Sequence, residues 1–411
     1  MKSETVRKIH KWHVWTGLLS GLNIFILSIT GSILVFVHEL HEAIGPEMPL
    51  VIETDDPASL RSAEVSPILQ EINSRHSGYR PAFLGIPTPA EHAEDPEHFA
   101  FFFELQRVPS EGNPEERAEN GPDHLEFFFD PGTGQYAGEG EEIDIPEWIW
   151  YLHANLFAGT MGQIFLGFIA VAFFISTVTG LIIYGPFMKG LLFGMIRMNV
   201  PIRLWMADLH KLIGIATLVF NLLMAGTGLL LTLGQFLVNV YSYTVISSLE
   251  PPQSTDGPRV SVERILDVSS DALPGTVRWI YFPGQLQGEH HYAAIAYEAG
   301  YFFSRLPHVA LIDAYSGKLS RVVDIPWFIE AVYVSQPLHF GDFGGLALRI
   351  VYSVLGLSSG TLAITGFILY LRRRGRGRDP RSSKKQPTIG TGANTGDPST
   401  ETRAPSLKPR D

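Results

Sequence analysis

Four long apolar segments interrupt the mixed polar pattern of this chain. They cover approximately residues 14–37, 160–184, 212–233 and 346–371, and each is nearly free of charged side chains. At about 1.5 Å of rise per residue, a helix of this length can cross a hydrocarbon core of about 30 Å. The pattern predicts an α-helical integral membrane protein with four transmembrane helices. The first segment is too long for the apolar region of a cleaved signal peptide and lacks a small-residue cleavage site, so we expect it to be retained.

The two long connections between these segments have a different pattern. Each begins with a short amphipathic helix, at residues 67–74 and 262–269, followed by aromatic or β-branched runs typical of strands at 99–105, 124–129, 292–297 and 308–312. A turn sequence follows at 130–134 and at 313–317. We therefore predict two duplicated halves, each with a small α+β module. Residues 89–120 are interpreted as a mobile insertion specific to the first module, and the tail after Arg378 as disordered.

Basic residues indicate the orientation. Lysine and arginine gather before the first span, between the second and third, and after the fourth, and such residues favour the cytoplasmic side. Both termini are predicted to be cytoplasmic. The expected order is N-terminus and first helix (1–37), first external module (38–152), second helix (153–185), cytoplasmic loop (186–209), third helix (210–233), second external module (234–338), fourth helix (339–371) and basic tail (372–411).

Charge and cysteine content narrow the possible functions. Residues 38–152 carry 25 Asp and Glu against 5 Lys and Arg, which is typical of a solvated face, with a cation-handling surface as the alternative. The chain has no cysteine, so thiolate-bound iron–sulfur clusters, disulfides and covalent c-type haem are excluded. No dinucleotide or phosphate-binding glycine motif occurs. We expect no nucleic-acid partner; membrane lipid is an expected one.

Four histidines recur at two fixed distances from four Thr-Gly pairs. Thr30-Gly31 follows His13 by seventeen residues, and Thr227-Gly228 follows His210 by seventeen. Thr179-Gly180 follows His153 by twenty-six residues, and Thr365-Gly366 follows His339 by twenty-six. His13 and His210 begin the first and third spans, whereas His153 and His339 begin the second and fourth. A two-fold relation between the halves would therefore bring like histidines together in two pairs.

Two imidazoles facing each other across a planar cofactor form the ligand set of a six-coordinate haem b. Seventeen helical residues rise about 25 Å, so Thr30-Gly31 and Thr227-Gly228 should lie at the depth of the opposite histidine pair. The four glycines would then allow a porphyrin face to approach the backbone. The alternatives are interfacial histidines that stay wet and Thr-Gly pairs that serve only in helix packing.

Other histidines are weaker candidates. His10 lies one helical turn before His13 and could replace it, and His38 with His41 could bind a metal or a substrate. The remaining ones lack ligand-like spacing and are interpreted as surface or strand residues: His76, His92, His98, His124, His290, His291 and His308.

Three sequence features resemble those of the PepSY-associated transmembrane helix family. They are residues 11–18 (KWHVWTGL) with 29–36 (ITGSILVF), residues 338–345 (LHFGDFGG), and the Asp-x-x-Thr/Ser-Gly strand ends. Together they cover about residues 7–374. The resemblance implies a bacterial inner-membrane protein with periplasmic PepSY-like modules, whose best understood members are di-haem ferric siderophore reductases. It also implies that His13, His210, His153 and His339 are the axial ligands of two b haems.

The leading hypothesis from this resemblance is an oxidoreductase that conducts electrons across the membrane. Quinol or a flavoprotein would supply electrons, and a ferric siderophore or other iron chelate would accept them, with Trp148, Trp150, Trp327 and Tyr333 in the external docking surface or in an interfacial aromatic belt. One alternative is a redox subunit that passes electrons between quinone and a periplasmic protein. Another is a haem-free PepSY binding or sensor protein.

Overall fold

The computed structural model describes most of the membrane-spanning and strand-forming parts of the chain. Several predicted features lie outside the described residues: His92, His98, the flanks of the proposed insertion, the turn after Asp130 and the tail from residue 377. The described residues are 3–44, 65–87, 101–108, 124–130, 136–139, 145–187, 196–250, 255, 257–285, 289–298 and 305–376.

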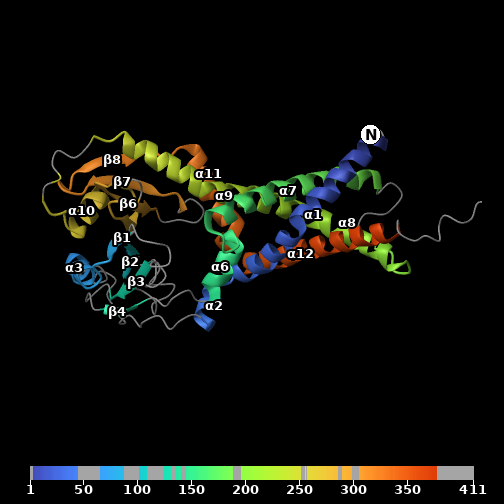
Figure 1. The fold of residues 1–411 in the computed structure, drawn as a ribbon, viewed down its shortest axis with the longest axis horizontal. Helices are drawn as coiled ribbons and strands as arrows, with labels where there is room; N and C mark the ends of the chain where they lie inside the picture. The colour runs from blue at the N-terminus through green and yellow to red at the C-terminus, as the bar shows by residue number, and fades with distance from the viewer. Residues whose placement is uncertain are drawn as a thin grey trace, which may run out of the picture. The chain divides into compact units, whose positions relative to one another are not determined.

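Four helices in the described chain are long and apolar enough to cross a membrane, as predicted (Figure 1). They are α1 (Ser3–Leu34), α7 (Gly159–Phe187), α9 (Leu218–Ser247) and α12 (Gly345–Arg376). Large apolar side chains such as Leu22, Phe168 and Val354 are 58–70% exposed on these helices. Such side chains are costly in water but not in hydrocarbon, so these faces contact lipid.

Small residues bring α1 and α12 together. A Cβ on Gly356 would lie 2.6 Å from Ser32 Oγ, and one on Gly360 would lie 3.2 Å from Ser28 Cβ. The Ser32 hydroxyl donates to the Ser28 carbonyl at 2.6 Å, and the Ser353 hydroxyl donates to the Ser32 carbonyl at 3.2 Å. Close backbone approach and interhelical hydrogen bonds are the usual means of helix association in lipid. Small residues therefore line the place where α1 and α12 meet.

His153 and His339 do not lie on the spanning helices to which the sequence assigned them. They lie near the ends of two short helices, α6 (Ile145–Asn155) and α11 (Trp327–Phe340). The backbone breaks after each one. Leu156 and Phe157 have φ of 54° and 57°, and Gly341 has φ of 71°; an α-helix cannot continue through such left-handed residues. The predicted segments 153–185 and 339–371 thus each contain the end of one helix and a new helix.

The predicted third span also differs from the structure. Residues 210–233 fall across α8 (Ile202–Ala216) and α9, which meet at Thr217. Helix α9 continues fourteen residues past Leu233, and α11 packs along it. Gly234 allows this contact, because a Cβ there would lie 2.5 Å from Val332 Cγ1. The glycine therefore marks a close helix crossing and not the end of the span.

The two expected external modules share one sheet of eight strands, with order β4-β3-β2-β1-β5-β6-β7-β8 and antiparallel pairing throughout. The join is the pairing of β1 with β5, in which Leu84 lies opposite Ile280. The strands are β1 (Tyr79–Gly85), β2 (Phe101–Arg107), β3 (His124–Phe129), β4 (Tyr136–Glu139), β5 (Thr276–Tyr281), β6 (His291–Tyr297), β7 (His308–Asp313) and β8 (Leu319–Val323).

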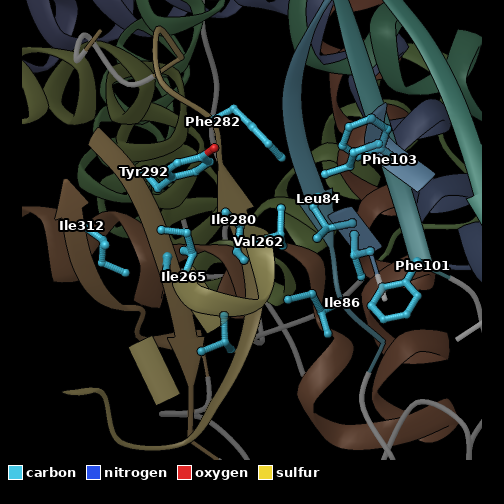
Figure 2. Packing of buried hydrophobic residues seen from close by; sticks show 14 of the residues in the cluster. Leu84, Ile86, Phe101, Phe103, Val262, Ile265, Ile280, Phe282, Tyr292 and Ile312 are labelled. Carbon is cyan, nitrogen blue, oxygen red and sulfur yellow. The ribbon is translucent and has the colours of Figure 1, made fainter. Parts of the chain in front are cut away.

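Two amphipathic helices contact this sheet, α3 (Val65–Arg75) and α10 (Val262–Ala272). They confirm the helices predicted around 67–74 and 262–269. Apolar side chains from both helices and from strands of both halves form one continuous core, in which Leu84, Ile265 and Ile280 are at most 1% exposed (Figure 2). The core therefore crosses the β1–β5 join. The order of elements after α3 matches that after α10, but the duplication itself stays a prediction from the histidine spacings.

The interpretation of residues 89–120 as one insertion is wrong for its centre. Residues 101–107 form β2, which pairs with both β1 and β3. Phe103 and Leu105 are almost fully buried there. The strand-like run at 99–105 was the correct signal, and the charged residues on either side of it obscured the alternation of buried and exposed positions.

Candidate functional site

The structure brings the four histidines together in two pairs. The ring centres of His13 and His210 lie 6.3 Å apart, with 72° between the ring planes. Those of His153 and His339 lie 6.2 Å apart, with 61° between the planes. We call these the first pair and the second pair. The pairing of like histidines, which the sequence predicted from a two-fold relation, is present in the structure.

This separation suits one metal ion between each pair of rings. A metal–imidazole bond is about 2.0 Å long and a ring nitrogen lies about 1.2 Å from the ring centre, so two imidazoles bound in line hold their centres about 6.4 Å apart. An edge-to-face ring pair without a metal falls in the same range. A metal-bound pair and an edge-to-face pair can thus have the same ring separation, so the hydrogen bonds of the rings are needed to tell them apart.

Each of the four rings uses its Nδ1 atom for a hydrogen bond to a spanning helix. The His153, His210 and His339 Nδ1 atoms lie 2.9 Å from the hydroxyls of Thr30, Thr365 and Thr227, respectively. His13 Nδ1 lies 2.9 Å from the backbone carbonyl of Ser176 instead. Three of the four threonines noted in the sequence thus contact a histidine directly.

The threonine hydroxyls determine which ring nitrogen carries the proton. The hydroxyls of Thr30, Thr227 and Thr365 already donate to the carbonyl four residues earlier in their own helices, at 2.9, 2.7 and 2.9 Å. A hydroxyl has only one proton, so a hydroxyl that donates to its own helix accepts a hydrogen bond from the histidine Nδ1–H. A carbonyl can only accept, so His13 also carries its proton on Nδ1.

The consequence is that all four neutral rings keep an unprotonated Nε2. Metal-bound histidines typically donate their other ring N–H to an oxygen of the protein, which fixes the tautomer and the ring orientation. The four histidines have this arrangement. They are therefore suited to act as axial ligands, two to a metal, which is the ligand set of a closed bis-histidine haem.

The four glycines lie against the histidine rings. A Cβ on Gly31 would lie 2.8 Å from His153 Cε1, and one on Gly228 would lie 3.3 Å from His339 Cε1. Gly180 and Gly366 approach His13 and His210 in the same way, at 3.1 Å each. Each glycine makes room for the imidazole itself; that these glycines also admit a porphyrin face stays a prediction.

These contacts have a regular arrangement along the chain. Within the first half, His13 rests on Gly180 of α7, and His153 rests on Gly31 of α1. Within the second half, His210 and His339 exchange contacts with α12 and α9 in the same manner. Each half therefore holds its own two histidines, whereas each ring pair joins one histidine from either half.

A cavity of about 1030 Å³ includes the second pair. Its walls contain His153, His339, Gly31 and Gly228, and it extends to strands β5–β8. The volume is at the upper end of the range for small-molecule and cofactor sites, so the second pair has space beside it for a planar group. No Lys or Arg lines the cavity among the residues described, and the propionates of a haem would therefore have to reach water.

The other candidate histidines do not join these pairs. His210 faces His13. His38 is exposed on the short helix α2 (Val37–Ile44), which also carries His41. His308 lies 3.1 Å from Glu298, and His76 packs against Tyr79 and Phe127. In the described parts of the chain, no three His, Asp or Glu side chains gather in a way that could hold a metal ion.

The aromatic residues ahead of the second pair are divided between two surroundings. Trp148 and Trp327 are 54% and 78% exposed, which suits an interfacial belt. Trp150 and Tyr333 line the cavity. Tyr352 was not predicted from the sequence; its hydroxyl donates to the Leu338 carbonyl at 2.9 Å and thereby holds the turn next to His339.

The chain is similar to a bacterial protein. It is 27% identical over 261 residues to a protein of Pseudomonas aeruginosa named Uncharacterized protein PA4219, an alignment that covers 56% of this chain and 64% of that one. The chain thus spans less than two thirds of the length of this relative.

A family model described as the PepSY-associated TM region matches residues 10–373. The match includes all of α7 and α9, most of α1 and α12, both histidine pairs and the whole sheet. The chain belongs to the PepSY-associated TM region family.

Proposed function

We propose that this protein is a bacterial inner-membrane oxidoreductase that conducts electrons between two b haems, one at each histidine pair. The observation that carries the proposal is the pair geometry: two ring pairs with centres 6.2–6.3 Å apart, each ring with its Nδ1 atom 2.9 Å from a threonine hydroxyl or a backbone carbonyl of a spanning helix. Haem with both axial positions filled supplies one-electron transfer and leaves no position for oxygen binding.

The chain's own residues perform three tasks in this proposal. The histidines would bind iron, the threonine hydroxyls and the Ser176 carbonyl would hold the rings in the required tautomer, and the glycines would allow the rings to seat against the helices. Both termini would be cytoplasmic, so the first pair would face the cytoplasm and the second the periplasm. Electrons would enter from quinol or a flavoprotein.

We propose a periplasmic ferric siderophore or other ferric chelate as the acceptor. Hard oxygen ligands hold ferric iron more tightly than ferrous iron, so one-electron reduction would loosen the chelate and release iron. The support for this substrate class is the resemblance to family members that reduce ferric siderophores.

A second candidate is a redox subunit that links quinone to a periplasmic protein. The cavity beside the second pair supports it, because no charged side chain lines that cavity in the described chain, whereas chelates of ferric iron are commonly charged.

The test is the optical spectrum of the purified protein, oxidised and then reduced with dithionite, together with a pyridine haemochrome count. Two low-spin b haems per chain are expected. The His339→Ala variant should retain one haem and lose ferric chelate reduction, whereas His308→Ala, at a partly exposed strand position outside both pairs, should retain both haems and the reduction. A protein without haem would instead be a PepSY binding or sensor protein.

A further inference from the structure

The cavity beside the second histidine pair extends well beyond the two rings. At one end it is lined by Gly31, Gly228 and Ala225 of the spanning helices. At the other end it is lined by strand residues, including Val309 and Leu311 of β7. It therefore offers space for a second molecule in addition to a group held between the rings.

The lining carries no charge. Among the described residues that line the cavity there is no Asp, Glu, Lys or Arg, although charged residues make up 18% of the chain. Burial raises the pKa of the Tyr281 and Tyr333 phenols, with a further contribution from their mutual interaction for Tyr333, so both stay neutral. A charged ligand that loses its hydration shell here would find no opposite charge, at a cost of several kcal/mol. The cavity therefore selects a neutral molecule.

A few neutral polar groups are available to orient such a molecule. Tyr333, Gln336 and His339 follow one another at three-residue intervals on α11, and all three line the cavity. Gln163 lines it from α7. Within the described chain, the amides of Gln163 and Gln336 make no hydrogen bond to protein. An amide can both donate and accept, so each could pair with a carbonyl or a hydroxyl of a ligand.

We propose that this cavity binds a lipid-soluble quinone or quinol. Its ring is neutral, carries a carbonyl or hydroxyl on opposite sides, and has an apolar tail, which together match an apolar cavity with separated amides at the end of a spanning bundle. Binding does not depend on haem. Any exchange of electrons between the quinone and the second pair would rest on the proposed function.

The probe is decylubiquinone, added to the detergent-purified protein and followed by isothermal titration calorimetry. We expect saturable binding, and none for an anionic quinone sulfonate without a tail. Val309→Glu, which places a carboxylate on the cavity wall, should abolish binding. The matched control is Val322→Glu on β8, where the side chain is 43% exposed and does not line the cavity; it should bind as the wild type does.

A second variant tests the orienting amide. Gln336→Leu preserves size and removes one hydrogen bond, and should weaken binding about tenfold. Its elution in size-exclusion chromatography should match that of the wild type, so that unfolding does not imitate the loss. The proposal is overturned if Val309→Glu binds decylubiquinone with wild-type affinity, if the wild type shows no saturable binding, or if an uncharged ferric hydroxamate binds and the quinone does not.

The same preparation separates this proposal from the proposed function. Haem is counted by pyridine haemochrome before each titration. Binding of decylubiquinone to protein without haem would support the quinone site and remove the electron conduit. Haem without quinone binding would leave the conduit in place and overturn the quinone site.

Discussion

At the residue scale, the main finding is a division of labour between threonine and glycine. The threonine hydroxyl accepts a hydrogen bond from the imidazole Nδ1–H. The glycine that follows the threonine leaves space for the ring. A lone histidine in a membrane protein has several possible roles, but this combination restricts both the tautomer and the position of the ring. The sequence revealed the Thr-Gly spacing; it did not reveal the contact, because each partner lies on another helix more than a hundred residues away.

Gly31→Ala tests the contribution of ring space. Its Cβ would lie 2.8 Å from His153 Cε1, so the ring must move, at a cost of about 1–3 kcal/mol. We expect haem content to fall from two to one per chain. The control is Gly21→Ala on the same helix, where a Cβ meets nothing within 4 Å and alanine is the better helix former. Equal haem content in the two variants would contradict the role given to Gly31.

Thr227→Val tests the hydrogen bond to His339. Valine has nearly the same shape but cannot accept the Nδ1 proton, and loss of such an outer partner typically weakens metal binding about 10–100-fold. Haem should therefore dissociate faster from the second pair, which transfer to apomyoglobin measures. Thr361→Val is the matched control, because Thr361 also donates to its own helix, at 3.0 Å to Leu357, but is exposed. Similar haem dissociation rates in the two variants would rule out Thr227 as the hydrogen-bond acceptor that supports His339.

At the scale of elements, the helices that carry His153 and His339 are separate from the spanning helices. Hydropathy could not reveal this, because apolar residues continue through both breaks. Leu156 and Phe157 are especially hard to anticipate, since non-glycine residues with positive φ are uncommon and strained. The glycines at 341 and 345 gave a clearer signal of a break in the second half.

The strands were predicted unevenly for a physical reason. β3, β6 and β7 are rich in aromatic or β-branched residues and were recognised, as was most of β2. β1 contains Pro81 and has an irregular register there, and proline is atypical of strand interiors. The β1–β5 join brings together residues about two hundred positions apart, and no local pattern specifies such a pairing.

A hydrogen-bonded contact between α3 and α10 gives the sheet domain a pH dependence. Glu263 accepts from the Ser66 backbone N–H at 2.8 Å and from the Ser66 hydroxyl at 2.5 Å. Burial of the carboxyl raises its pKa, but the hydrogen bonds from Ser66 and from its own helix start lower it further, below the ordinary 4.5. This contribution to stability is thus complete above about pH 4.5 and is lost as the pH falls through the lowered pKa.

Glu263→Gln should therefore lower the melting temperature at pH 7 and have a smaller effect at pH 3.5, because protonation of the wild-type carboxyl increases as the pH falls. Melting curves followed by circular dichroism at the two pH values measure this. Glu71→Gln removes an exposed carboxylate of α3 and controls for the change in net charge. A loss that is the same at both pH values would show that the Glu263 charge does not contribute.

At the scale of the whole molecule, the four-helix membrane architecture and the pairing of like histidines followed from sequence alone. Long apolar segments and fixed residue spacings are properties of the linear chain, so they can be recognised without knowing which surfaces meet in the fold. The single sheet, the charge-free cavity and the exchange of histidine contacts within each half did not follow, because they depend on which surfaces meet after folding.

The depth of the two pairs has an electrical consequence. Thr30, which holds His153, lies seventeen residues after His13 in the single helix α1, so the pairs are about 25 Å apart along it. In a hydrocarbon core of about 30 Å, an electron passing between them would traverse most of the membrane field. A charge that crosses the whole field changes in energy by about 2.3 kcal/mol per 100 mV.

Outward electron transfer should consequently run faster when the interior is negative. In proteoliposomes with an internal reductant and an impermeant external acceptor, a potassium diffusion potential of either sign provides the measurement. An interior-negative potential should accelerate reduction of the acceptor and the opposite sign should slow it; a rate independent of voltage would mean that electrons do not pass between the pairs. In this view the protein is electrogenic, and it would draw on membrane voltage as well as on chemical reducing power.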